Sequence, residues 1–208
     1  MTVKEISLYH LTHIQNLEGI IASGLLCDKK AQGRSPRSIA YPHLKAKRQN
    51  CRVPLAPGGV VADYAPFHFA PCSPMLYAIF KGYVPNAPGQ SQIVYLVTTV
   101  GQVLERGLPC VFTDRHPLSP SVRFYNNPDL LPQVIRWDIM RSEYWHDTWE
   151  IPNRKSLRQA EFLVHDYLPW ECVVMIGVYD SSMLQHVQSL LQNAPHKPVV
   201  QVCRRWYY

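Results

Sequence analysis

Several features are missing from this sequence, and each absence excludes a class of protein. The six cysteines are scattered without a C-x-x-C pair, which favours reduced structural thiols over a zinc ribbon or a disulfide framework. No apolar run approaches the ~20 residues that a membrane-spanning helix needs. The first residues lack the charged-then-apolar pattern of a secretory signal. We therefore expect a cytoplasmic protein with no membrane segment.

Internal repeats and low-complexity tracts are also lacking, whereas apolar residues are plentiful. They make up 47% of the 208 residues, which favours a globular core over a disordered chain. A chain of this length can form one well-buried domain. Residues 1–208 are therefore expected to fold as a single domain.

Positive charge exceeds negative charge by six, which favours a polyanionic partner. One basic group lies between residues 29 and 52, and a second lies between residues 136 and 158. The aromatic residues interleaved with the second group are Trp137, Tyr144, Trp145 and Trp149. Cations alternating with aromatic rings are typical of a single-strand-binding groove, although the same rings could pack inward from a helix.

Periodicity and turn residues predict an α+β domain. Strands are expected at 6–10, 64–71, 93–97, 161–164, 172–178 and 199–205, and helices at 16–23, 38–48, 74–80 and 182–191. Gly24 is suited to end the first helix, and Ser73 followed by Pro74 is suited to begin the third. Residues 27–37 are expected to form a loop. Residues 112–160 show no clean strand pattern, which in a compact domain is usual for a functional or disordered segment.

Three short motifs contain residues that could carry chemistry. His10 and Thr12 lie at the end of the first expected strand, His68 lies in the second, and Glu161 opens a later one. A carboxylate at the first residue of a buried strand either faces solvent at the strand end or is a fixed catalytic group. Each motif alone is compatible with a structural role, so a functional interpretation depends on the combination of the three motifs.

In this order the motifs resemble those of the ADP-ribosyltransferase superfamily, where a His-x-Ser/Thr element, an aromatic element and a late glutamate surround NAD. The likeness is sharpest to the DarT family, the DNA ADP-ribosyltransferase toxins of bacterial DarT–DarG toxin–antitoxin pairs. The segments that carry it are YHLTHIQNL (9–17), SIAY (38–41), DYAPFHFAPCSPMLYAI (63–79), FTDRH (112–116), QAEFLV (159–164) and RWYY (205–208). The resemblance covers essentially the whole chain, and the block at 64–79 is highly specific.

The resemblance implies an ADP-ribosyltransferase fold with split mixed sheets flanked by helices. It implies a toxin that transfers ADP-ribose from NAD to a base of single-stranded DNA, releases nicotinamide and blocks replication. In the branch that this chain most resembles, the acceptor is N3 of thymine, whereas another branch modifies guanine. NAD is then a co-substrate, no metal is involved, and the protein partner is a DarG-type macrodomain antitoxin.

Family roles can be carried over to residues of this sequence. The resemblance implies that Arg48 and Glu161 are catalytic and that residues 112–160 present the acceptor base. The residues that it places at the NAD cleft are His10, Leu11, Thr12, Gly19, Cys27, Arg48, His68, Ser73 and Tyr77. The chain departs from the family at His68, where tyrosine is usual, and at Cys72, where arginine is common. An imidazole can still stack on nicotinamide, with less area.

Contacts to DNA are expected from basic and aromatic side chains in the same region of the sequence. The candidates are His116, Trp145, Trp149, Arg154 and Lys155. Cations would contact phosphates and rings would stack on bases, although surface packing explains the same residues. Since thymine N3 lies on the Watson–Crick edge, the acceptor base must be unpaired.

The chemistry of the transfer agrees with these roles. Breaking the nicotinamide–ribose bond builds oxocarbenium-like charge, which a fixed carboxylate such as Glu161 stabilises. Thymine N3 is a weak nucleophile until it loses its proton. The family role of Arg48 is proton acceptor, but a guanidinium normally stays protonated. Stabilisation of the thymine anion or of the NAD pyrophosphate fits arginine better, and the alternatives remain open.

Three other interpretations compete with this one. An NAD-dependent RNA-modifying enzyme of the same fold, such as an RNA 2′-phosphotransferase, would be expected to present more arginines and no Gln-x-Glu motif. A non-catalytic nucleic-acid-binding domain would need Glu161 only as a strand end. A metal enzyme is the weakest, since the spacings of the histidines and cysteines match no common metal site.

Overall fold

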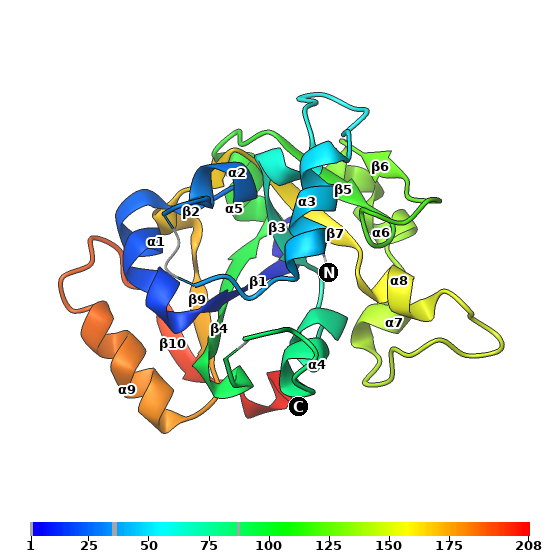
Figure 1. Ribbon diagram of the computed structural model, residues 1–208. Helices are drawn as coiled ribbons and strands as arrows, with labels where there is room; N and C mark the ends of the chain where they lie inside the picture. Colours follow the sequence, from blue (N-terminus) through cyan, green and yellow to red (C-terminus); the bar gives the residue numbers. More distant parts are fainter. Residues whose placement is uncertain (1, 35–36, 87) are drawn as a thin grey trace.

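A mixed β-sheet lies at the centre of the protein in this computed structural model, which describes residues 2–34, 37–86 and 88–208 (Figure 1). Its strands are β1 (Ser7–His13), β3 (Tyr64–His68), β4 (Ile93–Thr99), β5 (Cys110–Thr113), β6 (Phe124–Tyr125), β7 (Glu161–His165), β9 (Met175–Val178) and β10 (Val199–Val202). Within the described residues, these eight strands follow the order β10-β9-β4-β1-β3-β7-β5-β6. β9 and β10 run parallel, whereas the other neighbours are antiparallel.

The sheet consists of two halves that meet between β1 and β3. β1 pairs with β4 along its whole length, but it meets β3 at one Cα pair, Tyr9 and His68. Beyond this point, β3 pairs with β7 from Tyr64 to His68, and His68 lies opposite Glu161. The sheet is therefore nearly divided beside His68, which confirms the expected split of a mixed sheet.

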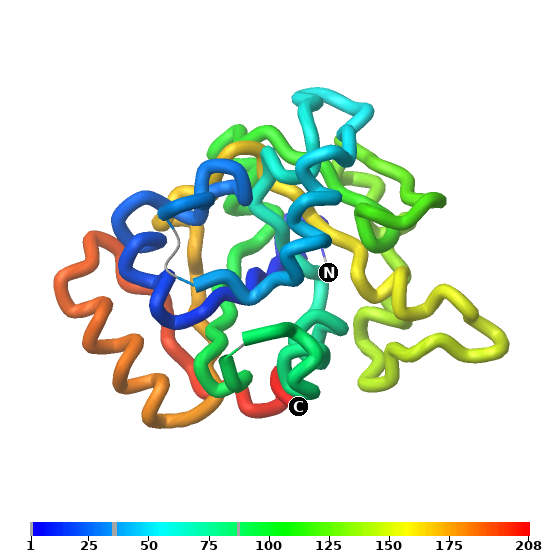
Figure 2. The backbone as a smooth tube through the Cα atoms, in the orientation of Figure 1, coloured from blue at the N-terminus to red at the C-terminus, as the bar shows by residue number. Residues whose placement is uncertain are grey.

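Short helices surround the sheet (Figure 1). They are α1 (Leu17–Ser23), α2 (Asp28–Ala31), α3 (Pro42–Asn50), α4 (Pro74–Phe80), α5 (Val100–Glu105), α6 (Leu131–Val134), α7 (Trp137–Arg141), α8 (Arg154–Arg158) and α9 (Ser181–Leu190). In the backbone trace, the segment that joins α7 to α8 projects from the rest of the chain (Figure 2). Across the described ranges, no helix has the length and apolar character required to cross a bilayer.

Two helix boundaries expected from the sequence are confirmed. Gly24 ends α1 with φ of 76°, and a Cβ added there would lie 2.6 Å from the carbonyl oxygen of Leu168, so glycine is required. Ser73 precedes α4, and its hydroxyl accepts a hydrogen bond from the amide of Leu76 at 3.2 Å. Pro74 then occupies the first helical position, where its missing N–H has no intrahelical partner to lose.

The core explains why the central strands are continuous apolar runs. β4 lies between β9 and β1 and is buried from Ile93 to Thr98, which is expected of a strand covered on both faces. Phe67 of β3 and Phe162 of β7 are fully buried neighbours in the register of the other half. Leu8 of β1 belongs to the same buried apolar cluster as Phe67 and Phe162, so the two halves share a core.

The structure differs from the sequence-based expectations in four places. Residues 28–31, expected in a loop, form α2, and α3 begins at Pro42 instead of residue 38 because proline favours the first helical position. Residues 112–160, which show no clean strand pattern in the sequence, nevertheless contain strand residues, since β5 reaches Thr113 and β6 pairs with it. A two-residue strand such as β6 leaves no periodic signal. The small sheet of β2 (Leu25–Leu26) and β8 (Tyr167–Leu168) went unpredicted for the same reason.

Candidate active site

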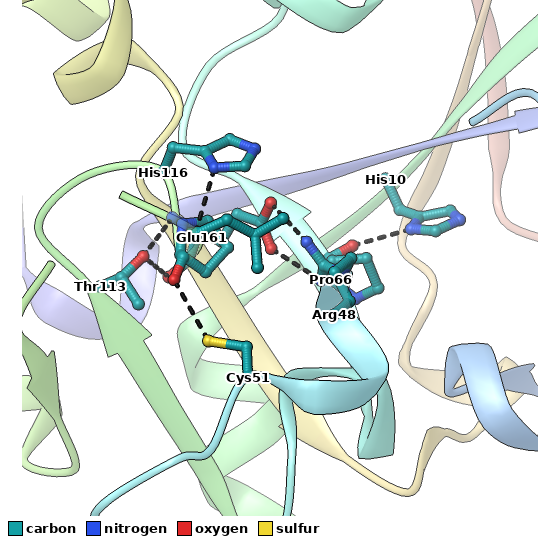
Figure 3. A network of polar contacts seen from close by, with 9 residues as sticks. His10, Arg48, Cys51, Pro66, Thr113, His116 and Glu161 are labelled. Atoms are coloured by element: carbon teal, nitrogen blue, oxygen red, sulfur yellow. Dashed lines mark hydrogen bonds and ion pairs between the residues drawn. The ribbon is translucent and has the colours of Figure 1, made fainter. Parts of the chain in front are cut away.

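An ion pair between α3 and β7 forms the centre of the candidate site (Figure 3). Glu161 is the first residue of β7, and Arg48 lies in the last turn of α3. The guanidinium donates from Nη1 to Oε1 at 3.0 Å and from Nη2 to Oε2 at 2.9 Å. The side chains are only 14% and 6% exposed, so water screens this bidentate pair weakly. The two expected catalytic residues are therefore in direct contact.

Glu161 is ionised in this setting. Burial alone would raise the pKa of its carboxyl, but the field of Arg48 and the hydrogen bonds from Arg48 outweigh burial and hold the pKa below its ordinary value. The Glu161 backbone is also fixed, because its amide donates to Oγ1 of Thr113 at 3.0 Å. A negative charge thus stands at a defined point of the sheet junction.

His10 lies on one side of the pair and presents a defined tautomer. Its Nδ1 is 2.8 Å from the carbonyl oxygen of Pro66, which can only accept, so Nδ1 carries the proton. Burial lowers the pKa of His10, which keeps the ring neutral and leaves Nε2 as an acceptor. Thr12, two residues along β1, is buried, and its Oγ1 accepts from Nδ2 of Asn16 at 3.0 Å. The Thr12 hydroxyl proton remains free to bind an acceptor.

His116 lies on the opposite side of Glu161 from His10 (Figure 3). Its Nδ1 accepts from the amide of Leu118 at 3.2 Å, so the neutral ring carries its proton on Nε2. Burial lowers the pKa of His116, while the charge of Glu161 opposes that change. The backbone amide of His116 donates to the Ser156 carbonyl at 2.9 Å, which ties this turn to α8. His116 therefore offers an N–H donor beside the ion pair.

His68 carries a buried polar atom without a partner. Its Nδ1 is inaccessible to solvent and forms no hydrogen bond with any described residue. Burial lowers the pKa of His68 to about 4, so the ring is neutral near pH 7. A buried group of this kind is destabilising by about 1–3 kcal/mol unless it is paired. Its position opposite Glu161 suits a ligand that supplies the missing hydrogen bond.

The remaining residues expected at the NAD cleft have varied surroundings. Leu11 packs in an apolar cluster with Leu76, whereas a Cβ added at Gly19 would meet open space. Cys27 is buried at the start of α2. Ser73 uses its hydroxyl to cap α4, and Tyr77 packs against Trp145 and Tyr208. Their contacts with NAD remain predictions.

The residues expected to bind DNA separate into two groups. Trp149 is 96% exposed on the projecting segment, and Lys155 at the start of α8 is exposed as well. Arg154 reaches back from α8 to the Tyr144 carbonyl at 2.9 Å. Trp145 is instead 3% exposed, and its Nε1 donates to the Tyr208 hydroxyl at 2.7 Å. Trp145 is therefore a packing residue in this structure and cannot stack on DNA without leaving its partners.

Arg158 is a residue whose role the sequence did not reveal, because it reads as one more cation of a basic segment. The structure buries it, and its Nη1 donates to the carbonyls of Ile139, Met140 and Ser142 at 2.6 to 2.9 Å. Its Nη2 donates to the Pro71 carbonyl at 2.7 Å. Arg158 therefore fastens the end of α7 and the turn after β3 to the helix that leads into Glu161.

Removing this fastening is expected to destabilise the fold. Arg158→Met leaves four carbonyls without their charged donor, and we expect the free energy of unfolding to fall by about 3 kcal/mol. Urea denaturation measures the change, with Arg141→Met, which alters an exposed arginine of α7, as the control. An equal midpoint for the two variants would contradict this role of Arg158.

The arrangement is suited to holding a substrate that develops positive charge during its reaction. Among the residues that the structure describes, no group of three or more potential metal ligands is found. A fixed carboxylate, one guanidinium and three neutral histidines instead surround one point of the sheet junction. These groups can stabilise positive charge on one side and negative charge on the other.

Comparison with known proteins gives a consistent result. The family model described as "ssDNA thymidine ADP-ribosyltransferase, DarT" matches residues 9–208. A DNA ADP-ribosyl transferase of Thermus sp. (strain 2.9) is 41% identical over 203 residues, covering 97% of this chain and 95% of the relative. One of Mycobacterium tuberculosis is 30% identical over 186 residues, covering 88% and 81%.

Solved structures agree with this result. Thermus sp. 2.9 DarT in complex with ADP-ribosylated ssDNA superposes with a TM-score of 0.92 at 39% identity, covering 98% of this chain and 96% of that one. The same protein in complex with NAD+ gives a TM-score of 0.88 at 38% identity, covering 98% of each chain. Fold and sequence thus point to one family.

Proposed function

This chain belongs to the DarT family of ssDNA thymidine ADP-ribosyltransferases, and we propose that its Arg48–Glu161 pair transfers ADP-ribose from NAD to an unpaired thymine base. The protein is an NAD-dependent DNA ADP-ribosyltransferase, with NAD as co-substrate. The observation that carries the residue assignment is the buried bidentate contact between Arg48 and Glu161. It places a carboxylate and a guanidinium within reach of the same reacting atoms.

NAD is proposed to lie across the junction of the two half-sheets. The acceptor Nε2 of His10 and the hydroxyl of Thr12 suit the hydroxyls of a ribose, since one accepts and the other donates. The nicotinamide is proposed to lie against His68, whose unpartnered Nδ1 suits a hydrogen bond to the carboxamide. This placement sets the nicotinamide–ribose bond beside Glu161, which lies opposite His68.

Glu161 is proposed to stabilise the ribose cation as nicotinamide leaves. The bond from C1′ to the pyridinium breaks, the electron pair leaves with neutral nicotinamide, and the carboxylate faces the resulting oxocarbenium charge. Thymine N3 then forms the new bond to C1′, and its proton is released to solvent. A carboxylate fixed by Thr113 and kept ionised by Arg48 provides this stabilisation without reorganising.

Arg48 and His116 are proposed to act on the acceptor base. A guanidinium does not accept a proton near neutral pH, but it can stabilise the negative charge that N3 and its neighbouring carbonyls gain on deprotonation. His116 presents Nε2–H from the side opposite His10, where it can donate to a thymine carbonyl. N3 is accessible only in an unpaired base, so the substrate is single-stranded.

The rest of the chain is proposed to hold the DNA strand. Residues 112–160 present the base within one domain spanning 1–208, and Trp149, Arg154 and Lys155 contribute stacking and phosphate contacts. Modified template bases block replication in the cytoplasm, which makes the protein a toxin. A DarG-type macrodomain antitoxin is the partner that the family implies. A relative from Thermosipho africanus is named as a fusion of a DNA ADP-ribosyl transferase with a DNA ADP-ribosyl glycohydrolase.

The proposal is tested by the mass of short oligonucleotides incubated with protein and NAD. A strand with a single thymine is expected to gain one ADP-ribose unit, and the same strand annealed to its complement is expected to gain none. A strand without thymine is the control. Modification of the duplex, or of the strand without thymine, would contradict the proposed acceptor geometry.

His68 provides a second test, directed at the nicotinamide site. His68→Phe keeps an aromatic ring but removes Nδ1, so the KM for NAD is expected to rise about tenfold with little change in kcat. His68→Tyr, which matches the usual family residue, is expected to recover most of the affinity. His186→Phe, on the exposed face of α9, is the control. A His68→Phe enzyme with wild-type KM would contradict the hydrogen bond from NAD.

A further inference from the structure

A cavity of about 430 Å³ lies between the end of α3 and the turn that follows His116. Building on the function proposed above, we propose that this cavity binds a nucleotide next to the acceptor thymine and sets the sequence context of the reaction. None of the candidate DNA contacts considered above lines it. Its volume lies in the range of ~300–1,000 Å³ that is usual for small-ligand pockets.

The walls of the cavity are joined to the candidate active site by two short connections. Lys47, Asn50 and Cys51 lie at the spacing of neighbouring helix positions at the end of α3, and Arg48 of the same last turn reaches Glu161. Across the cavity, Pro117 directly follows His116 in the chain. A ligand here would therefore lie one step from the base held between Arg48 and His116.

The position of the cavity favours DNA over NAD. In Figure 3, Cys51, Thr113 and His116 lie on the side of Glu161 opposite His10, which is the residue proposed to hold the NAD ribose. Cys51 joins the two walls of the cavity, since its Sγ donates to the Pro117 carbonyl at 3.5 Å. The cavity is therefore lined by residues on the acceptor side of the ion pair.

The lining suits a base with an attached phosphate. Leu118 and Val122 offer apolar surface for the face of a base, while the exposed Lys47 can reach a phosphate. Asn50 donates one Nδ2 hydrogen to the Ala46 carbonyl at 3.0 Å, which leaves Oδ1 as an acceptor and the second N–H as a donor. An amide with one acceptor and one donor pairs with the exocyclic amino group and the neighbouring ring nitrogen of adenine, so adenine is preferred here.

The test compares the wild-type protein with a variant in which the cavity is filled. Ala46→Trp places an indole in the cavity from an exposed helix position, and Asn50→Ala removes the acceptor without adding bulk. The substrates are oligonucleotides with one acceptor thymine and an abasic residue at each flanking position in turn. Lys197→Ala, an exposed change between α9 and β10, is the control for general effects.

The wild type is expected to lose about tenfold or more in kcat/KM when one particular flanking position is abasic. On intact DNA, Ala46→Trp is expected to show the reduced kcat/KM that the wild type shows with the abasic residue at that position. An abasic residue there is expected to reduce kcat/KM of Ala46→Trp no further, and the KM for NAD is expected to stay unchanged. Asn50→Ala is expected to lose its preference among bases at the same position.

Two results would overturn the inference. The first is an equal loss for the wild type and Ala46→Trp at every abasic position, and the second is a raised KM for NAD in Ala46→Trp, which would place NAD in the cavity. Both leave transfer to thymine intact, so they are distinct from a failure of the proposed function, in which the wild type modifies no oligonucleotide.

Discussion

Replacing Glu161 with glutamine is expected to reduce the rate of ADP-ribose transfer about 1000-fold, because the amide has the shape of the carboxylate but no charge to set against the ribose cation. Glutamine can still accept a hydrogen bond from Arg48, so the fold and the binding of NAD are expected to persist. Single-turnover transfer to a thymine oligonucleotide measures the rate, and titration of NAD by calorimetry measures the binding.

Glu171→Gln is the matched control, since it makes the same change at an exposed position near β9. Transfer by Glu161→Gln at a rate close to that of Glu171→Gln would contradict a catalytic role for the carboxylate. A non-catalytic nucleic-acid-binding domain would transfer ADP-ribose in neither variant and would bind DNA equally well in both. Loss of NAD binding together with activity would instead indicate a role in binding alone.

The pH dependence of kcat/KM provides a second test of the Glu161 carboxylate. Since the pKa of Glu161 lies below its ordinary value, the carboxylate stays ionised in weak acid, and its contribution is lost only as the pH falls through that lowered pKa. Arg48→Ala removes the opposing charge, so burial then raises the pKa. The acid limb of kcat/KM for the residual activity of Arg48→Ala is therefore expected to move to higher pH.

Arg48→Lys is expected to reduce transfer about 100-fold even though it preserves the charge, because an ammonium cannot form both hydrogen bonds of the planar guanidinium. The loss alone does not separate stabilisation of the thymine anion from contact with the NAD pyrophosphate. An acceptor with a more acidic N3 separates them. If Arg48 stabilises the anion, replacing the acceptor thymine with 5-fluorouracil is expected to recover much of the loss in Arg48→Lys.

The control is Arg52→Lys, an exposed change just beyond α3. An equal benefit of 5-fluorouracil for the wild type and Arg48→Lys would exclude action of Arg48 on the base and favour the pyrophosphate. Wild-type activity in Arg48→Lys would show that charge alone is sufficient.

Local information predicted the position of Glu161 at the start of a strand, since this carboxylate precedes the apolar run 162–164, whereas its catalytic role came from the family resemblance. No local sequence pattern indicated the contact between Glu161 and Arg48. The two residues are 113 positions apart, and α3 shows no apolar stripe, since it places no apolar residue in the core. Only the resemblance to a family identified Arg48, and only the fold brought it to Glu161.

Trp145 and Arg158 show where the sequence gives little guidance. Both lie in a basic, aromatic stretch of the sequence, and both are buried in the structure. Neither lies in a long periodic element, so the sequence could not distinguish a ring that stacks on DNA from one that packs on Tyr208. Arg158 is buried by contacts with backbone carbonyls, which any sequence can supply.

The measurement that tests the central claim most directly uses an oligonucleotide whose only thymine is methylated at N3. The methyl group removes the proton and blocks the reacting atom while leaving the base unpaired and nearly the same shape. If the Arg48–Glu161 pair directs ADP-ribose to N3, the unmodified strand gains one ADP-ribose unit and the methylated strand gains none. A gain of the same mass on the methylated strand would contradict transfer to thymine N3.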